Sequence, residues 1–148
     1  MVRDYLRLAP SEPGRTEQDQ SRVVLVGMFC EQPPLGLLRT IERAGCWVVD
    51  DDLLLGLRWL RADVSTQGDP IECLVEAYLA HSASTASRYE PAGERGGWLV
   101  DTVRRSGAEG VLFCAPSFCD PALLEQPMLI AALDRVGIPH TQFKYSED

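Results

Sequence analysis

The stretch that decides the fold is Val111-Leu112-Phe113-Cys114-Ala115-Pro116-Ser117-Phe118-Cys119-Asp120-Pro121. Its apolar first half predicts a buried β-strand, and a proline-containing turn then leads into a helix that begins at Asp120-Pro121. This order places the Cys119 sulfur at the carboxyl end of a strand and at the positive end of a helix, where a thiolate is stabilised. We therefore expect Cys119 to face an open cleft, as a nucleophile or a metal ligand.

The rest of the chain alternates apolar strands with helices. The segments 22–28 and 46–49 read as strands, and the helix expected between them carries Leu37, Leu38 and Ile41 on one face. This alternation predicts an α/β fold: an open, mostly parallel four-stranded sheet flanked by helices, in a three-layer flavodoxin- or Rossmann-like arrangement. The other expected elements are a helical end at 2–8, helices at 34–44, 53–60, 71–81 and 121–136, a helix carrying Trp98, Leu99 and Val103 that ends near Gly107, and strands at 111–114 and 141–145.

Two of the expected helices have clear signals. Asp69-Pro70 caps the helix at 71–81, in which we expect Leu74, Tyr78 and Cys73 to face inward. In the helix at 121–136, five apolar residues recur at helical spacing. They are Leu123, Leu124, Met128, Leu129 and Leu133.

Length and composition bound the possible functions. The 148 residues predict a helix end and linker at 1–21 and one α/β domain at 22–148. The net charge of −8, without a stripe of Lys or Arg, argues against nucleic-acid binding. Neither a membrane span nor a secretory signal is evident, and five cysteines without a disulfide pattern indicate reduced thiols in the cytoplasm.

The end of the chain and one missing motif also bear on the predicted function. Because the sequence stops in or just after a strand, we expect it to be a fragment of a larger subunit. It contains no Gly-rich phosphate loop, so we do not expect this chain to hydrolyse ATP by itself.

Two cysteines follow strands and so meet the conditions for a ligand site, because ligands collect at the carboxyl ends of parallel strands. Cys119 follows one strand and Cys30 another, and the two sulfurs share a crevice if these strands are neighbours. Cys46, Cys73 and Cys114 lie within expected elements and are expected to be inert. Neither His81 nor His140 completes a metal-ligand pattern, so a cluster needs ligands from outside these residues.

Polar residues near the strand ends are weaker candidates. Gln32 and Ser117 could donate hydrogen bonds to a ligand carbonyl, and Glu31 lies beside Gln32. The acidic run at 50–52 could bind a cation, but three adjacent carboxylates in a loop are more often a solvated turn or a helix cap. We therefore expect Glu31, Gln32 and Ser117 to contact substrate and the acidic run to be solvated.

Four segments carry a family resemblance. They are Gly27-Met28-Phe29-Cys30-Glu31-Gln32-Pro33-Pro34-Leu35-Gly36-Leu37, Val48-Val49-Asp50-Asp51-Asp52, Gly110 to Pro121, and Phe143-Lys144-Tyr145. Together they resemble the benzoyl-CoA reductase and 2-hydroxyacyl-CoA dehydratase family.

The resemblance implies an oxygen-sensitive enzyme of several subunits. One pair of subunits is an ATP-hydrolysing activator supplied with electrons by ferredoxin, and the other pair carries 4Fe-4S clusters and reduces the ring of benzoyl-CoA to a cyclic diene. Cys119 matches a cluster ligand of the family. Cys30 matches a motif position whose side chain either ligates iron or lines the substrate pocket. Family members are more than twice this length, so we expect the chain alone to be inactive.

Two alternatives remain open. The chain could belong to a 2-hydroxyacyl-CoA dehydratase, in which a radical mechanism eliminates water, although the segments 30–34 and 115–117 favour the reductase. It could also be a non-catalytic, flavodoxin-like binding module. A phosphate-binding loop rich in Gly, Ser or Thr does not follow the first strand, which argues against a flavin or nucleotide ligand.

Overall fold

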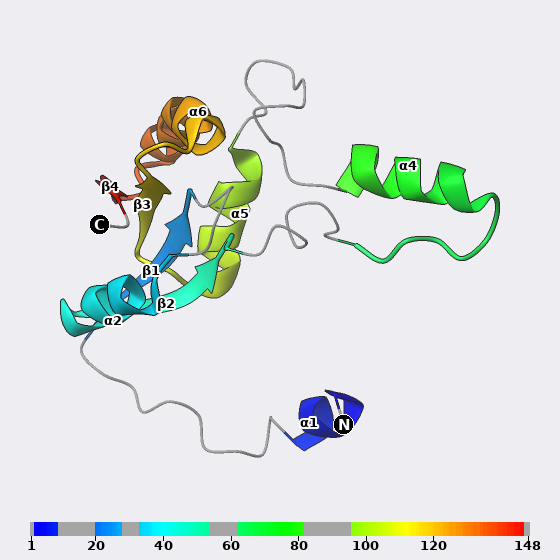
Figure 1. The fold of residues 1–148 in the computed structure, drawn as a ribbon, viewed down its shortest axis with the longest axis horizontal. Coiled ribbons are helices and arrows are strands. Elements are labelled where there is room, and N and C mark those ends of the chain that lie inside the picture. Colours follow the sequence, from blue (N-terminus) through cyan, green and yellow to red (C-terminus); the bar gives the residue numbers. More distant parts are fainter. Residues whose placement is uncertain (1, 9–19, 28–32, 54–61, 82–95, 147–148) are drawn as a thin grey trace.

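The computed structural model describes residues 2–8, 20–27, 33–53, 62–81 and 96–146 (Figure 1). The predicted helix at 53–60 lies almost entirely outside these residues. The other predicted elements are present, with ends that differ by a few residues. In chain order they are α1 (Val2–Leu8), β1 (Ser21–Val26), α2 (Leu35–Arg43), β2 (Cys46–Asp51), α4 (Pro70–His81), α5 (Gly97–Ser106), β3 (Gly110–Pro116), α6 (Asp120–Val136) and β4 (His140–Tyr145).

The four strands form one parallel sheet in the order β2-β1-β3-β4. Leu25 of β1 pairs with Asp51 on one side and with Leu112 on the other, so β1 and β3 are the central strands. The predicted parallel α/β fold is confirmed. The strands that precede Cys30 and Cys119 are neighbours, as a shared crevice requires.

Helices cover both faces of the sheet and make three layers (Figure 1). Val24 and Val26 point to the face covered by α5 and α6, where they pack with Leu99 and Leu133. The residue between them, Leu25, points the other way. There it packs with α2, including the predicted face formed by Leu37, Leu38 and Ile41. Period-two alternation along β1 thus supplies both cores.

The helices α5 and α6 touch closely at one glycine. A Cβ at Gly96, which precedes α5 with φ +87°, would lie 2.5 Å from the Cβ of Ala132. A side chain at position 96 would therefore push the two helices apart, and the positive φ would add strain. This contact fixes where α5 begins against α6.

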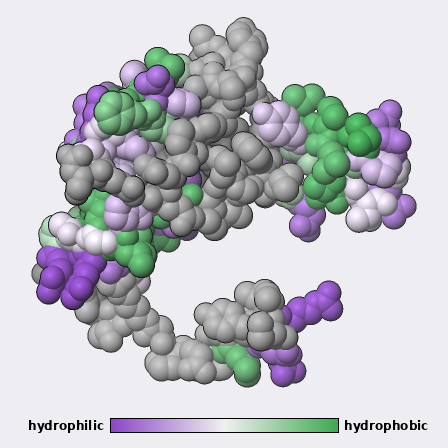
Figure 2. All heavy atoms as spheres, in the orientation of Figure 1, coloured by the Kyte–Doolittle hydropathy of each residue, from purple (hydrophilic) through white to green (hydrophobic). Residues whose placement is uncertain are grey.

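The helix α4 departs from the prediction. Its cap is as expected, since Asp69 Oδ1 accepts hydrogen bonds from the amides of Ile71 (2.9 Å) and Glu72 (3.1 Å). The inward placement of Leu74 and Tyr78 is wrong, because these side chains are 50% and 43% exposed. The reason is that α4 stands apart from the sheet, and Figure 2 shows hydrophobic atoms on its surface. Only Cys73 and Ala77 of α4 are buried.

None of the described helices is long and apolar enough to cross a membrane.

Candidate functional site

The predicted strand-to-helix turn is present at the carboxyl edge of the sheet. The strand β3 ends at Pro116, and Cys119 occupies the N-cap position of α6, with Pro121 in the first turn. The Cys119 amide donates to the Pro116 carbonyl (3.0 Å), and the Cys119 carbonyl accepts from the Leu123 amide (3.0 Å). Cys119 therefore lies at the predicted position, at the start of a helix of 17 residues.

The surroundings of Cys119 differ from the expectation. We expected its sulfur to face an open cleft, but the residue is 1% exposed and packs with Ala115, Ala122 and Leu123. The two alanines have small side chains, which leave room for the thiol between the end of β3 and the first turn of α6. The predicted cleft-facing orientation is therefore wrong for the described structure.

Cys114, five residues earlier, is a buried thiol on the other face of β3. It is fully buried and packs with Leu25 and Ile41. Burial, and second the charge of Asp52, raise the pKa of Cys114 to about 12. The thiol therefore keeps its proton at neutral pH and is a poor nucleophile or ligand, in agreement with its predicted inert role.

Asp52 is a buried carboxylate that the sequence reasoning missed. It is 4% exposed, its Oδ1 accepts from the Gly27 amide at 3.2 Å, and its own amide donates to the Leu25 carbonyl at 3.1 Å. We expected the acidic run to be a solvated turn. Instead, the first two aspartates belong to β2 and Asp52 ties the end of β2 to the end of β1.

The glycine held by Asp52 lies very close to β3. Gly27 has φ +116°, and a Cβ there would lie 3.2 Å from the Cys114 carbonyl oxygen. A side chain at this position would be strained by both the backbone conformation and the contact. Gly27 therefore fixes the point at which the chain leaves β1, directly beside β3.

Ser117 donates two hydrogen bonds within the chain. Its amide and its Oγ both donate to the Tyr145 carbonyl, at 2.8 and 3.0 Å. These hydrogen bonds join the end of β3 to the end of β4. The hydroxyl can still accept a hydrogen bond, but its donor is used within the chain in this structure.

Phe118, between Ser117 and Cys119, is 92% exposed. No role for this residue was predicted from the sequence. Its place in a short turn after a buried strand was the available signal, because side chains in such a turn can project beyond the sheet edge. An apolar ring this exposed offers a contact at the edge where Cys119 lies.

Three of the predicted site residues belong to the segment that follows β1. Cys30, Glu31 and Gln32 lie outside the described residues. The last described residue before them, Gly27, lies beside β3 at the carboxyl end of β1.

The described residues can contribute only in part to an iron–sulfur cluster. They contain no group of three or more His, Cys, Asp or Glu side chains that could hold a metal ion. Cys119 is the described thiol at the carboxyl edge, and it is buried. A cluster would therefore take one ligand from this region and its others from elsewhere, and the described residues alone do not fit it.

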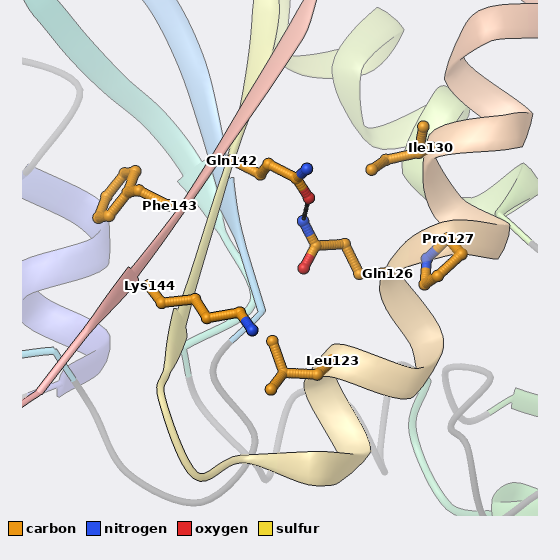
Figure 3. A pocket seen from close by; sticks show the side chains of 7 residues that line it. All are labelled: Leu123, Gln126, Pro127, Ile130, Gln142, Phe143 and Lys144. Carbon is orange, nitrogen blue, oxygen red and sulfur yellow. Dashed lines mark hydrogen bonds between the residues drawn. The ribbon is translucent and has the colours of Figure 1, made fainter.

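A cavity of about 600 Å³ lies at a different place, between α6 and β4 (Figure 3). None of the predicted site residues lines it. Its wall combines aliphatic side chains with two amides and one amine. The lining residues are Leu123, Gln126, Pro127 and Ile130 of α6 and Gln142, Phe143 and Lys144 of β4.

Comparison with known families gives one match over nearly the whole chain. The family model described as 2-hydroxyglutaryl-CoA dehydratase, D-component, matches residues 2–147.

Individual relatives agree with this match. The chain is 48% identical to a benzoyl-CoA reductase subunit of Thauera aromatica over 100% of its own length and 38% of that protein. It is 28% identical to the (R)-phenyllactyl-CoA dehydratase beta subunit of Clostridium sporogenes over 80% of its length and 31% of the relative. It is 27% identical to the beta subunit of (R)-2-hydroxyglutaryl-CoA dehydratase of Acidaminococcus fermentans, over 84% and 33%. The chain thus spans about a third of the length of these relatives.

Proposed function

The chain belongs to the 2-hydroxyglutaryl-CoA dehydratase D-component family, and from this premise we propose that it acts within the substrate-reducing subunit of an ATP-dependent benzoyl-CoA reductase. The observation that carries the proposal is the 48% identity to a benzoyl-CoA reductase subunit over the whole chain. The dehydratase subunits are 24% to 28% identical to it. The reaction is reduction of the aromatic ring of benzoyl-CoA to a cyclic dienoyl-CoA.

In this proposal Cys119 gives one ligand to a 4Fe-4S cluster. When bound, such a cluster supplies electrons of low potential, tuned by burial and by hydrogen bonds to its sulfurs. The position of Cys119 at the N-cap of α6 supports this role, because that turn lies at the carboxyl edge of a parallel sheet, where ligands collect. Because Cys119 is buried, binding a cluster requires that the residues around its sulfur rearrange.

The segment after Gly27 is proposed to complete the site. Cys30 is a second, weaker candidate for the cluster, and Glu31 and Gln32 are candidates for contacts to the thioester. Asp52 supports this arrangement by holding the Gly27 amide, from which the segment departs. Ser117 is a candidate for accepting a hydrogen bond from substrate, since its donor is directed to Tyr145.

The same proposal names the partners. They are the other subunits of the reductase, including an ATP-hydrolysing activator pair, with ferredoxin as electron donor and benzoyl-CoA as substrate, in the cytoplasm. The sequence contains no phosphate loop, which is consistent with ATP hydrolysis elsewhere in the complex. The chain alone is expected to be inactive.

A 2-hydroxyacyl-CoA dehydratase is the second candidate. The description of the matching family and the dehydratase subunits among the relatives favour it. Both reactions use a CoA thioester, so the substrate that is turned over separates them.

The test is an anaerobic preparation of the full chain, co-expressed with the other subunits of its complex. Iron and acid-labile sulfide are measured in the wild type and in Cys119→Ser, and each is assayed with benzoyl-CoA and with 2-hydroxyacyl-CoA. We expect ring reduction by the wild type, and less iron and no ring reduction in Cys119→Ser. The matched control is Cys46→Ser, because Cys46 begins β2 at the opposite edge of the sheet.

The outcomes are distinct. Normal iron and normal turnover in Cys119→Ser would falsify the ligand role. Turnover of 2-hydroxyacyl-CoA without ring reduction would replace the reductase by the dehydratase. An iron-free wild-type complex without either activity would leave a binding module.

A further inference from the structure

The feature that the proposed function does not use is the outer edge of β4 with the cavity beside it. We propose that this edge is a docking site for an extended segment of a partner polypeptide, which adds to the sheet as a further strand and places an apolar side chain in the cavity. The inference does not depend on the reaction that the complex performs.

The main chain of β4 is open on its outer side in the described structure, because β4 is an edge strand. The Val111 amide donates to the Pro139 carbonyl (3.0 Å) and the Ser117 amide to the Tyr145 carbonyl (2.8 Å). In a regular parallel ladder, odd-numbered residues of β4 therefore face β3, and the backbone groups of Gln142 and Lys144 face outward. An added strand bonds to such groups.

The cavity lies against the same two residues. Gln142 and Lys144 form one wall, and Leu123, Pro127 and Ile130 of α6 form the other (Figure 3). The side chains of Gln126 and Gln142 hydrogen-bond to each other between the two walls. The side chains of Gln142 and Lys144 line the cavity, and their backbone groups face outward. One extended segment can therefore fill the cavity and pair with β4 at the same time.

The charge of the site indicates the composition of the segment. Lys144 is the only lysine in a chain of net charge −8, and its amine extends toward α6 in Figure 3. An acidic residue of the added strand, opposite Lys144, would complement it. Phe143 points to the other face of β4 and would accept an apolar neighbour there. The expected segment therefore combines apolar residues with one acidic residue.

A second copy of this chain is a poorer occupant. The strand β4 reads His140-Thr141-Gln142-Phe143-Lys144-Tyr145 and contains no acidic residue. Pairing two copies of β4 edge to edge would leave Lys144 without a carboxylate from the partner strand. A small molecule could fill the cavity but would leave the strand edge open, so these observations favour a separate polypeptide.

The test selects binders to the full chain from a displayed library of random nine-residue peptides. The dissociation constants of synthetic binders are then measured for wild type, Gln142→Pro, Lys144→Glu and Ile130→Glu. Proline at 142 removes an outward-facing amide and spares the pairing to β3, so the fold should survive. Circular dichroism checks each variant, and Lys144→Arg is the charge-conserving control.

We expect the selected peptides to alternate apolar and polar residues and to contain one acidic residue. Their affinity should fall at least about tenfold with Gln142→Pro, Lys144→Glu or Ile130→Glu. N-methylation of alternate peptide amides should abolish binding for one set of positions and spare it for the other. Amide exchange at 142 and 144 should slow on binding, while exchange at 141 and 143 stays unchanged.

Three results would overturn the proposal. The first is that the library yields no peptide whose affinity falls in the β4 variants. The second is binding that tolerates every N-methylation, which would mean that the cavity takes a side chain or small molecule without strand addition. The third is sedimentation showing self-association that Gln142→Pro removes, which would make a second copy the occupant. If Gln142→Pro fails to fold, the methylated peptides and Lys144→Glu decide the question.

Discussion

Two helices of this chain have apolar residues at helical spacing but lie in opposite surroundings. In α6, Leu129 and Leu133 are 3% and 0% exposed, whereas in α4, Leu74 and Tyr78 are 50% and 43% exposed. The helix α6 packs on β3 and α5, and α4 stands away from the sheet (Figure 1). Periodicity therefore shows which residues share a face of a helix, but it does not show what covers that face.

The largest contrast should come from matched leucine truncations. We expect Leu133→Ala to lower the free energy of unfolding by about 2–5 kcal/mol, because it leaves a cavity between α6 and the sheet. Leu74→Ala should change it by less than about 0.5 kcal/mol, because Leu74 is half exposed. Urea unfolding of both variants measures the difference. Equal losses would mean that α4 is as tightly packed as α6.

The next largest loss of stability should come from replacing the buried carboxylate of Asp52. Asp52→Ala removes the acceptor of the Gly27 amide, and we expect a loss of about 1–3 kcal/mol in the free energy of unfolding. Asp51→Ala, at an exposed position of the same run, is the control and should cost much less. A loss at Asp51 as large as at Asp52 would contradict the structural role of the buried carboxylate.

The protonated thiol of Cys114 should make the free energy of unfolding fall at alkaline pH. The pKa of Cys114 is about 12 in the fold, above its ordinary value of 9.0. Between these pH values the unfolded thiol loses its proton and the folded one keeps it, so stability falls as pH rises, by up to about 1.4 kcal/mol per pH unit. Unfolding of the wild type and Cys114→Ala from pH 8 to 11 tests this. The variant should show a shallower decline, and identical slopes would refute the expectation.

The smallest effect should be confined to α4. Asp69→Ala removes the cap and should weaken the helix locally by about 1 kcal/mol. Amide exchange should quicken within α4 and stay unchanged in the sheet, with the same midpoint of global unfolding. A lowered midpoint would show that α4 is coupled to the core.

The sequence predicted the elements whose signals are local. The apolar run of β3, the turn that follows it and the start of α6 were all readable, because each depends on residues next to one another in the chain. The cap at Asp69 and the apolar run of β1 were readable for the same reason. The family resemblance drawn from four short segments is confirmed by the match over residues 2–147.

The details of the site depend on contacts between distant segments. The pairing of β1 with β2 shifts between Val23 and Val24, so Leu25 lies opposite Asp51 instead of Asp50. This shift helps to set how the acidic run meets β1, and it cannot be read from a run of three aspartates. The burial of Cys119 likewise depends on Ala115 and Ala122, whose small size matters only once β3 and α6 meet.

The solitary lysine has a practical consequence. An amine-directed reagent such as a succinimidyl dye has only the ε-amine of Lys144 and the α-amine of the chain to attack. A fluorophore or cross-linker can therefore be attached beside β4 without mutagenesis. Cross-links formed there within an assembled complex would identify, by mass spectrometry, the neighbour at that edge of the sheet.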